Sequence, residues 1–181
     1  QDMMITGIES GGPSFIRYPR GEGQGVNRKN TPIPLEIGKA EVLRQGELCS
    51  IWAIGDFVQT ALFIADNFQE KYDINITVVN ARFIKPLDKE TLLMHAGSHD
   101  CLITLEDNVL MGGFGSGILE FFEQNDINTQ VKRFGWPDKF VEHGNSVKEL
   151  RAKVGLDQES LMASIETILS LDKKMATPIF A

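Results

Sequence analysis

From residue 37 onward, short apolar runs alternate with longer amphipathic stretches, and this alternation constrains the fold more than any other feature. Residues 48–54, 74–79 and 101–105 are short apolar runs, and 74–79 is dominated by β-branched side chains, which predicts buried strands. Residues 130–134 predict another strand. Residues 37–44 predict a further strand. Strands that alternate with helices of ten to fifteen residues are typical of β-α-β units. The sequence therefore predicts an α/β fold with a mostly parallel sheet.

The stretches between these runs predict helices. Asp56 is the expected N-cap of the first helix, because apolar residues recur at helical spacing from Phe57 to Phe68. A second helix is expected at 89–97, and a third follows the glycine loop 112–117 and runs through Glu123. Two closing helices are expected at 146–154 and 158–171, the second capped by Asp157.

The first 35 residues have a different character. Residues 1–26 are rich in glycine and contain one strand-like run, 13–19, that ends in proline. Residues 27–34 are polar and carry Pro32 and Pro34, which favour an extended linker. We expect a tail of one domain at 1–35, a complete domain at 36–172 and a loose tail at 173–181. Because the chain starts at Gln1 without an initiator Met, we interpret it as a piece cut from a longer protein.

Composition excludes several classes of protein. The chain has 181 residues, 42% hydrophobic and 24% charged, which is typical of globular domains and not of disordered chains. No apolar run approaches the roughly 18 residues that a membrane span needs. A net charge of −7 argues against nucleic acid as the main partner. Two cysteines form no disulfide framework and favour a reducing, cytosolic compartment.

Arg17 and Arg20 form a small basic island in this acidic chain. A guanidinium group binds phosphate or carboxylate through two parallel hydrogen bonds, so the pair suits a phosphorylated substrate. The alternative is a solvated strand end whose arginines make their own salt bridges. The spacing alone favours this second interpretation.

The glycine loop 112–117 and the adjoining Glu106 and Asp107 are the next candidates. A helix N-terminus attracts anions, but the third glycine of the dinucleotide motif would fall on Ile118, and the lysine of a P-loop is absent. We favour a tight turn with close helix packing. Glu106 and Asp107 end a predicted parallel strand, where active-site carboxylates lie, although Asp107 is equally suited to capping a turn.

The histidines and cysteines give weaker signals. His95 and His99 are four residues apart and suit one helical face, but no third ligand follows at metal-binding spacing, so a zinc site is disfavoured. His143 is interpreted as structural. Cys49 and Cys101 lie in predicted strands, where a thiol behaves as a small apolar group. The residues alone therefore indicate an α/β domain with a possible anion site and no complete catalytic set.

Six motifs give a more specific signal, namely GPSFIRYPRG at 12–21, NARFIKPLD at 80–88, LEDN at 105–108, GGFGSG at 112–117, GWPD at 135–138 and GLD at 155–157. Together and in register, these motifs resemble the 1-deoxy-D-xylulose-5-phosphate synthase family over nearly the whole chain.

The resemblance implies a thiamine-diphosphate-dependent, transketolase-type transferase that also needs Mg²⁺. Such an enzyme decarboxylates pyruvate and adds the two-carbon unit to D-glyceraldehyde 3-phosphate, for isoprenoid, thiamine and pyridoxal biosynthesis. It implies a homodimer in the cytoplasm, or in a plastid-type stroma if the source is eukaryotic. It further implies that 1–35 ends a pyrimidine-binding domain and that 36–172 is a transketolase C-terminal-like domain, a sheet with helices on both faces.

The resemblance also assigns roles to particular residues. Arg20 matches a family arginine implicated in binding the phosphate of glyceraldehyde 3-phosphate, whereas Arg17 is expected to make structural pairs. Glu106, Asp107 and the glycine loop are expected to complete the fold and the dimer. No catalytic, metal-binding or cofactor-binding residue is assigned, because the family's ligands for the cofactor and Mg²⁺ are expected upstream of Gln1. The isolated chain is therefore expected to be inactive.

Two alternatives remain open at this point. Transketolase and the β subunits of 2-oxoacid dehydrogenases are similar in this domain, although the motifs at 17–21 and 82–88 favour the synthase. The other alternative is a standalone, non-catalytic domain that dimerises or binds an anion at its glycine loop.

Overall fold

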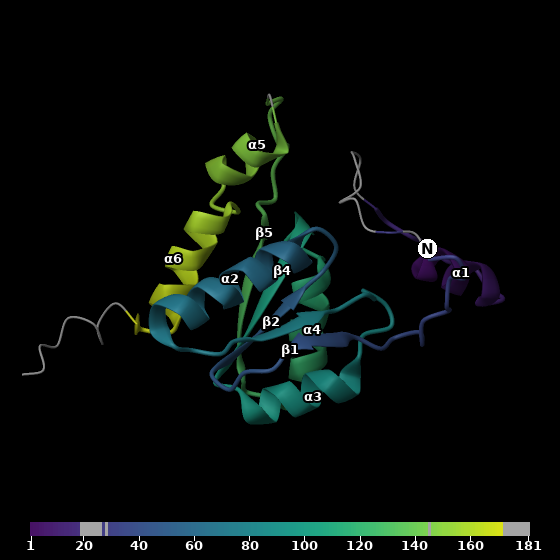
Figure 1. Ribbon diagram of the computed structural model, residues 1–181, viewed down its shortest axis with the longest axis horizontal. Coiled ribbons are helices and arrows are strands. Elements are labelled where there is room, and N and C mark those ends of the chain that lie inside the picture. The colour runs from purple at the N-terminus through teal and green to yellow at the C-terminus, as the bar shows by residue number, and fades with distance from the viewer. Residues whose placement is uncertain (19–26, 28, 145, 172–181) are drawn as a thin grey trace, which may run out of the picture.

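A computed structural model describes residues 1–18, 27, 29–144 and 146–171, and it contains a five-stranded sheet with the strand order β1-β3-β2-β4-β5 (Figure 1). The strands are β1 (Glu41–Arg44), β2 (Cys49–Ala53), β3 (Thr77–Asn80), β4 (Cys101–Val109) and β5 (Gln130–Trp136). β1 runs antiparallel to β3, and the other three pairs are parallel. The prediction of a mostly parallel sheet is confirmed, and the carboxyl ends of β2, β3, β4 and β5 meet at one edge.

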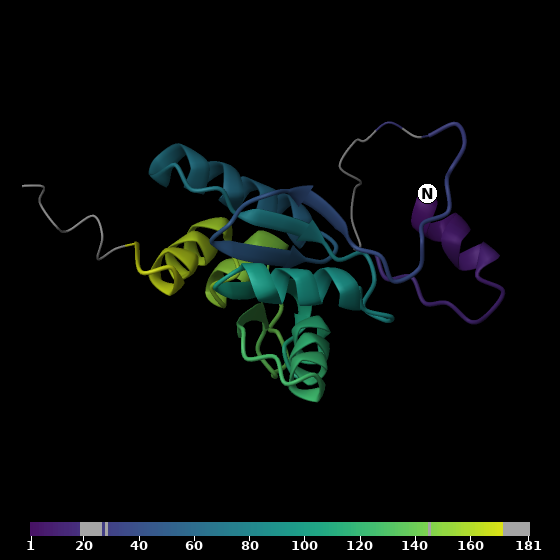
Figure 2. The same ribbon diagram turned by 90° about the horizontal axis from the view of Figure 1, so that it is seen from below.

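Helices cover both faces of the sheet (Figure 2). α2 (Phe57–Tyr72) and α6 (Gln158–Ile168) share one core with alternate residues of the strands, and α3 (Lys89–Ser98) and α4 (Phe114–Gln124) share the other. In β2, for example, Ile51 belongs to the α2 side and Trp52 to the α3 side. Because both faces are covered, β2 is buried along its whole length, which explains its continuous apolar sequence.

Of the two predicted N-cap side chains, that of Asp157 caps its helix and that of Asp56 does not. Asp157 accepts a hydrogen bond from the Ser160 backbone at 3.1 Å, as predicted for the start of α6. α2 begins after Asp56 as predicted, but the Asp56 side chain makes no capping hydrogen bond. Its carboxylate faces Arg151 instead, at 3.7 Å.

Two boundaries at the carboxyl edge differ from the prediction. β4 continues to Val109, so that Glu106 and Asp107 lie within the strand and not after it. α4 begins at Phe114, which makes Gly115 and Gly117 helical and leaves only the first two glycines of 112–117 in a turn. A Cβ atom on Gly115 would lie 2.6 Å from Thr104 Oγ1, so this glycine allows α4 to pack closely on β4.

The first segment contains a helix that the glycine-rich pattern did not predict, α1 (Asp2–Glu9), and residues 13–18 form no strand. α1 stands apart from the sheet in Figures 1 and 2, and hydrogen bonds join it to residues 29–35. Thr6 Oγ1 accepts a hydrogen bond from Leu35 N at 2.8 Å, and Asp2 Oδ1 accepts one from Ile33 N at 3.0 Å. The division of the chain at residue 35 stays a prediction. None of the helices in the described ranges is long and apolar enough to span a bilayer.

Candidate functional site

Charged and polar side chains gather where β4 and β5 end, and we call this group the carboxyl-edge cluster. It consists of Arg17, Asp56, Glu106, Asp107, Asn108, Trp136 and Arg151. Arg17 comes from the first segment, and Arg151 comes from α5 (Val147–Lys153). The cluster therefore joins parts of the chain that are far apart in sequence.

Arg17 is bound to the end of β4. Its Nη2 donates to the backbone oxygen of Asp107 at 2.8 Å, and its Nη1 donates to Asn108 Oδ1 at 3.2 Å. The expectation that Arg17 makes structural pairs agrees with these contacts. Arg20, the predicted phosphate-binding residue, lies outside the described residues, and its role stays a prediction.

The Asp107 side chain connects β4 to β5 and α5, and it does not cap a turn. Trp136 Nε1 donates to Asp107 Oδ1 at 2.6 Å, and Arg151 Nη2 lies 3.0 Å from Oδ2. The Arg151 guanidinium also lies 4.6 Å from the centre of the Phe57 ring. The sequence analysis did not select Arg151. Its charged partners lie 44 or more positions away in the sequence, and no spacing pattern relates residues that are so far apart.

Glu106 occupies the site that the glycine loop offers to an anion. Its side chain is 1% exposed, and its two carboxylate oxygens accept hydrogen bonds from the backbone N–H groups of Phe114 at 2.7 Å and Gly115 at 2.9 Å. Burial raises the pKa of Glu106, while these hydrogen bonds and the nearby arginines oppose that rise. Because Glu106 already fills the N-terminus of α4, this geometry favours a structural role for the loop over binding of an external anion.

Arg82 is a further candidate that sequence reasoning did not single out. It follows β3 at the same edge of the sheet, and its φ of 56° places a non-glycine residue in the left-handed region. Its Nη2 lies 2.6 Å from Glu41 Oε2. Strained backbone of this kind tends to occur at functional sites, and the surrounding structure must hold it in place.

His95 and His99 lie at the opposite end of the sheet, and both form hydrogen bonds with other side chains. His95 Nδ1 is 2.9 Å from Ser50 Oγ, and His99 Nε2 is 2.9 Å from Thr77 Oγ1. Burial, together with the charge of His99, lowers the pKa of His95 to about 4. Within the described ranges no three His, Cys, Asp or Glu side chains form a group that could hold a metal ion. His143 lies in an exposed stretch without regular structure.

Cys49 and Cys101 are both free and buried, as expected, and they are direct neighbours across β2 and β4. The interaction between their thiols, together with burial, raises the pKa of Cys49, so this thiol stays protonated.

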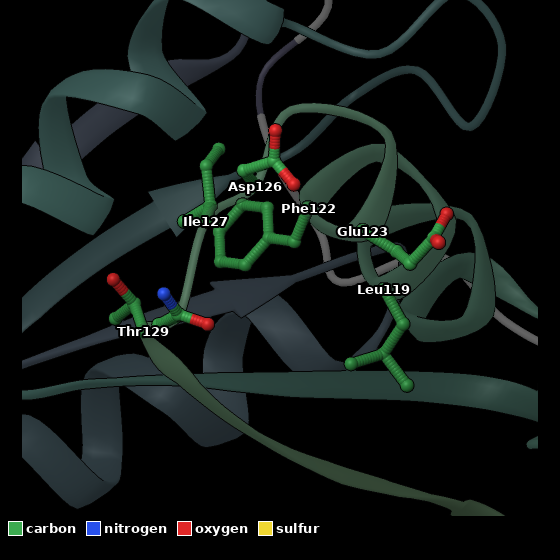
Figure 3. A pocket seen from close by; sticks show the side chains of 7 residues that line it. Leu119, Phe122, Glu123, Asp126, Ile127 and Thr129 are labelled. Atoms are coloured by element: carbon green, nitrogen blue, oxygen red, sulfur yellow. The ribbon is translucent and has the colours of Figure 1, made fainter.

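Two hollows in the described part of the chain lie away from the carboxyl-edge cluster. One of about 250 Å³ lies beside His95 and His99. The other, of about 440 Å³, lies between the end of α4 and the start of β5, where Leu119 and Phe122 meet the carboxylates of Glu123 and Asp126 (Figure 3). Neither lining includes Arg17, Glu106 or Asp107.

The sheet order, the helices on both faces and the polar cluster at the carboxyl edge define an α/β domain with one antiparallel edge strand. Residues 38–161 match the model of the transketolase C-terminal domain, and the chain therefore belongs to that family.

Comparison with curated proteins shows which members of this class the chain resembles. The chain is 44% identical, over 96% of its length, to a 1-deoxy-D-xylulose-5-phosphate synthase of Syntrophus aciditrophicus, and 44% identical over 93% to 1-deoxy-D-xylulose-5-phosphate synthase 2 of Geobacter sulfurreducens. It spans only 26% and 27% of those two proteins. A solved structure described as an inactive β4 tetramer of a split-gene transketolase matches with a TM-score of 0.68 and 30% identity, over 81% of this chain and 48% of that one. The resemblance to the C-terminal portion of the synthase is thereby confirmed.

Proposed function

We propose that this chain is the C-terminal portion of an enzyme that condenses pyruvate with D-glyceraldehyde 3-phosphate and releases CO₂. One observation carries the proposal, namely the 40–44% identity to proteins named 1-deoxy-D-xylulose-5-phosphate synthase over more than nine-tenths of the chain. The identity includes both the first segment and the sheet domain. The product would feed isoprenoid, thiamine and pyridoxal synthesis.

The proposed enzyme uses thiamine diphosphate and Mg²⁺, but the described part of this chain does not fit either group. It contains no trio of side chains suited to a metal ion, and Glu106 fills the N-terminus of α4. We therefore assign the cofactor and its metal to other parts of the parent protein. We propose that this chain contributes to the active site by binding the phosphate of the aldehyde substrate, and that Arg20 is the residue that binds it.

The position of Arg17 supports that assignment. Arg17 is fixed at the carboxyl edge, and three residues of chain span at most about 11 Å. Arg20 follows Arg17 by three residues, and the proposal has it act at the edge where parallel-sheet proteins bind ligands.

The remaining features of the proposal concern assembly. We propose that the parent is a cytoplasmic homodimer, and that the isolated chain is inactive. The structural relative described as an inactive β4 tetramer supports the proposal that a polypeptide with this domain needs a further part for activity. Transketolase itself is the weaker alternative, because the identity to that relative is 30% against 44% for the synthases.

The test compares the parent polypeptide with the isolated chain in an assay that contains pyruvate, glyceraldehyde 3-phosphate, thiamine diphosphate and Mg²⁺. We expect 1-deoxy-D-xylulose 5-phosphate from the parent and none from the isolated chain. In the parent, Arg20→Ala is expected to raise the KM for glyceraldehyde 3-phosphate much more than the KM for pyruvate. A parent that forms no product from these substrates, or turnover by the isolated chain, would contradict the proposal.

A further inference from the structure

We propose that Cys49 and Cys101 form a redox-active pair, which hydrogen peroxide converts into an intramolecular disulfide. The pair lies at the amino ends of β2 and β4, opposite the edge of the sheet to which the proposed function belongs. In a reducing compartment both residues remain thiols, and peroxide links the two strands until a dithiol separates them again.

The register of the sheet places the two cysteines side by side. Cys49 is the first residue of β2, Cys101 is the first residue of β4, and the parallel pairing sets one directly opposite the other. Neighbouring strands lie about 4.8 Å apart, and a disulfide joins Cα atoms that are about 4.4–6.8 Å apart. The bond therefore forms without a change in the pairing of the strands.

The two side chains lie on the same face of the sheet. Both belong to the buried cluster that α2 and α6 cover, and their thiol groups interact with each other. The chain has no other cysteine, so within one molecule each of the two has only the other as a partner. Position and orientation thus favour a bond inside one molecule over a bond between two.

The two thiols differ in reactivity. Interaction with Cys49 and the charge of Lys132 lower the pKa of Cys101, against the effects of burial and of Asp100, which raise it. For Cys49, interaction with Cys101 and burial both raise the pKa. The Cys101 side is also 4% exposed, whereas Cys49 is 0% exposed. Because the thiolate is the nucleophile, Cys101 attacks the oxidant and Cys49 completes the disulfide.

The oxidation proceeds in two balanced steps. The Cys101 thiolate attacks one oxygen of hydrogen peroxide, the O–O bond breaks, and the departing hydroxide takes up a proton and becomes water. The sulfur of Cys49 then attacks the sulfur of the resulting sulfenic acid. The S–O bond breaks, and the hydroxyl group leaves with the Cys49 proton as a second molecule of water. Two thiols are thereby oxidised to one disulfide, and one hydrogen peroxide is reduced to two molecules of water.

The test treats the 181-residue chain with hydrogen peroxide and follows its intact mass. We expect a mass lower by about 2 Da, for the two hydrogen atoms that are lost, and a return to the original mass with dithiothreitol. Peptide mapping without reduction should join the peptide of Cys49 to that of Cys101. This measurement needs no substitution, so it does not depend on whether a variant folds.

The variants Cys49→Ala and Cys101→Ala test the order of the two steps. In Cys49→Ala the sulfenic acid of Cys101 has no partner, and we expect a mass higher by about 16 or 32 Da. Cys101→Ala leaves only Cys49, whose thiol is buried and stays protonated, and we expect it to react at least about tenfold more slowly. Thermal unfolding shows whether each variant is folded before the rates are compared.

A second measurement separates reaction of the folded chain from reaction of unfolded molecules. The rate of disulfide formation should stay the same, within about twofold, when urea is added below the unfolding transition. A rate that rises in proportion to the unfolded fraction overturns the inference, because the native register would then play no part. Persistence of both thiols, or oxidation only to linked dimers or to sulfinic acid, overturns it as well. Faster oxidation of Cys101→Ala than of Cys49→Ala overturns the assignment of Cys101 as the first nucleophile.

Discussion

At the scale of single residues, Glu106 shows how a buried charge is accommodated in this domain. Its carboxylate lies against the N-terminus of α4, where two free N–H groups and the helix dipole favour a negative charge. Burial acts in the opposite direction and raises the pKa of Glu106. A Cβ atom on Gly113 would lie 2.2 Å from Glu106 Oε2, so the glycine next to α4 is needed for this carboxylate to fit.

The raised pKa of Glu106 has a consequence for stability. Above pH 4.5, the ordinary pKa of a glutamate, the folded protein holds this proton more tightly than the unfolded chain does, so stability should fall as pH rises through the folded pKa. Glu106→Gln removes the titration and keeps an acceptor. We therefore expect the free energy of unfolding of the wild type, minus that of Glu106→Gln, to decrease from pH 4.5 upward. Chemical denaturation at a series of pH values measures it.

Glu106→Ala is the companion variant for this experiment. It leaves the N–H groups of Phe114 and Gly115 without an acceptor, and we expect a loss of about 1–3 kcal/mol. A difference between wild type and Glu106→Gln that stays constant over the same pH range would show that burial does not raise the pKa of this carboxyl group.

Residue roles at the carboxyl edge were only partly predictable from the sequence. Glu106 and Asp107 lie within β4 and not after it, as the sequence predicts, but they do lie toward its carboxyl end. Their partners are not predictable, because the contacts of Asp107 with Trp136 and Arg151 depend on the tertiary fold. The anion-binding potential of the glycine loop was recognised as weak for a reason that the structure supports, since the chain fills the site itself.

At the scale of elements, the sequence was most informative where one pattern dominated. The apolar runs of β2 and β4 and the helical face of α2 predicted these elements within a few residues. α1 is not predicted, because it has only eight residues and lies in a glycine-rich stretch, which usually indicates a loop. The start of α4 was misplaced because glycines usually indicate a loop, whereas here Gly115 is helical and lies close to Thr104.

The helix α5 should depend on a single side chain. α5 has no buried residue, and Arg151 connects it to Asp107 and to the Phe57 ring. We expect Arg151→Ala to speed amide hydrogen exchange in α5 by about tenfold or more, equivalent to roughly 1.4 kcal/mol, with little change in α2. Hydrogen–deuterium exchange followed by mass spectrometry measures both helices at once.

Lys148→Ala is the matched control for α5, because Lys148 is an exposed cation on the same helix. It should leave the exchange of α5 unchanged. Equal exchange in wild type and Arg151→Ala would show that α5 is held by other contacts, and faster exchange throughout α2 would indicate general destabilisation.

At the scale of the whole molecule, the two cores lie entirely within the sheet domain. Every member of both buried clusters falls between Cys49 and Leu171, and the described first segment contributes none of them. The alternation of strands and helices predicted this arrangement, because it is set by local sequence patterns. What α1 packs against was not predictable, since the contacts of residues 1–18 involve polar groups without a periodic pattern.

This distribution of buried residues predicts different results for truncation at the two ends. Deleting residues 1–35 removes no core residue, and we expect one cooperative thermal transition with a Tm lowered by only a few degrees, about 2–4 °C for each kcal/mol lost. Deleting residues 147–181 removes Leu156, Leu161 and Ile165 from the core on the α2 side, and we expect no cooperative transition. Differential scanning calorimetry of the two truncated chains compares them directly. If deletion of residues 1–35 also abolishes the transition, the boundary near residue 35 is wrong and the first segment is part of the folding unit.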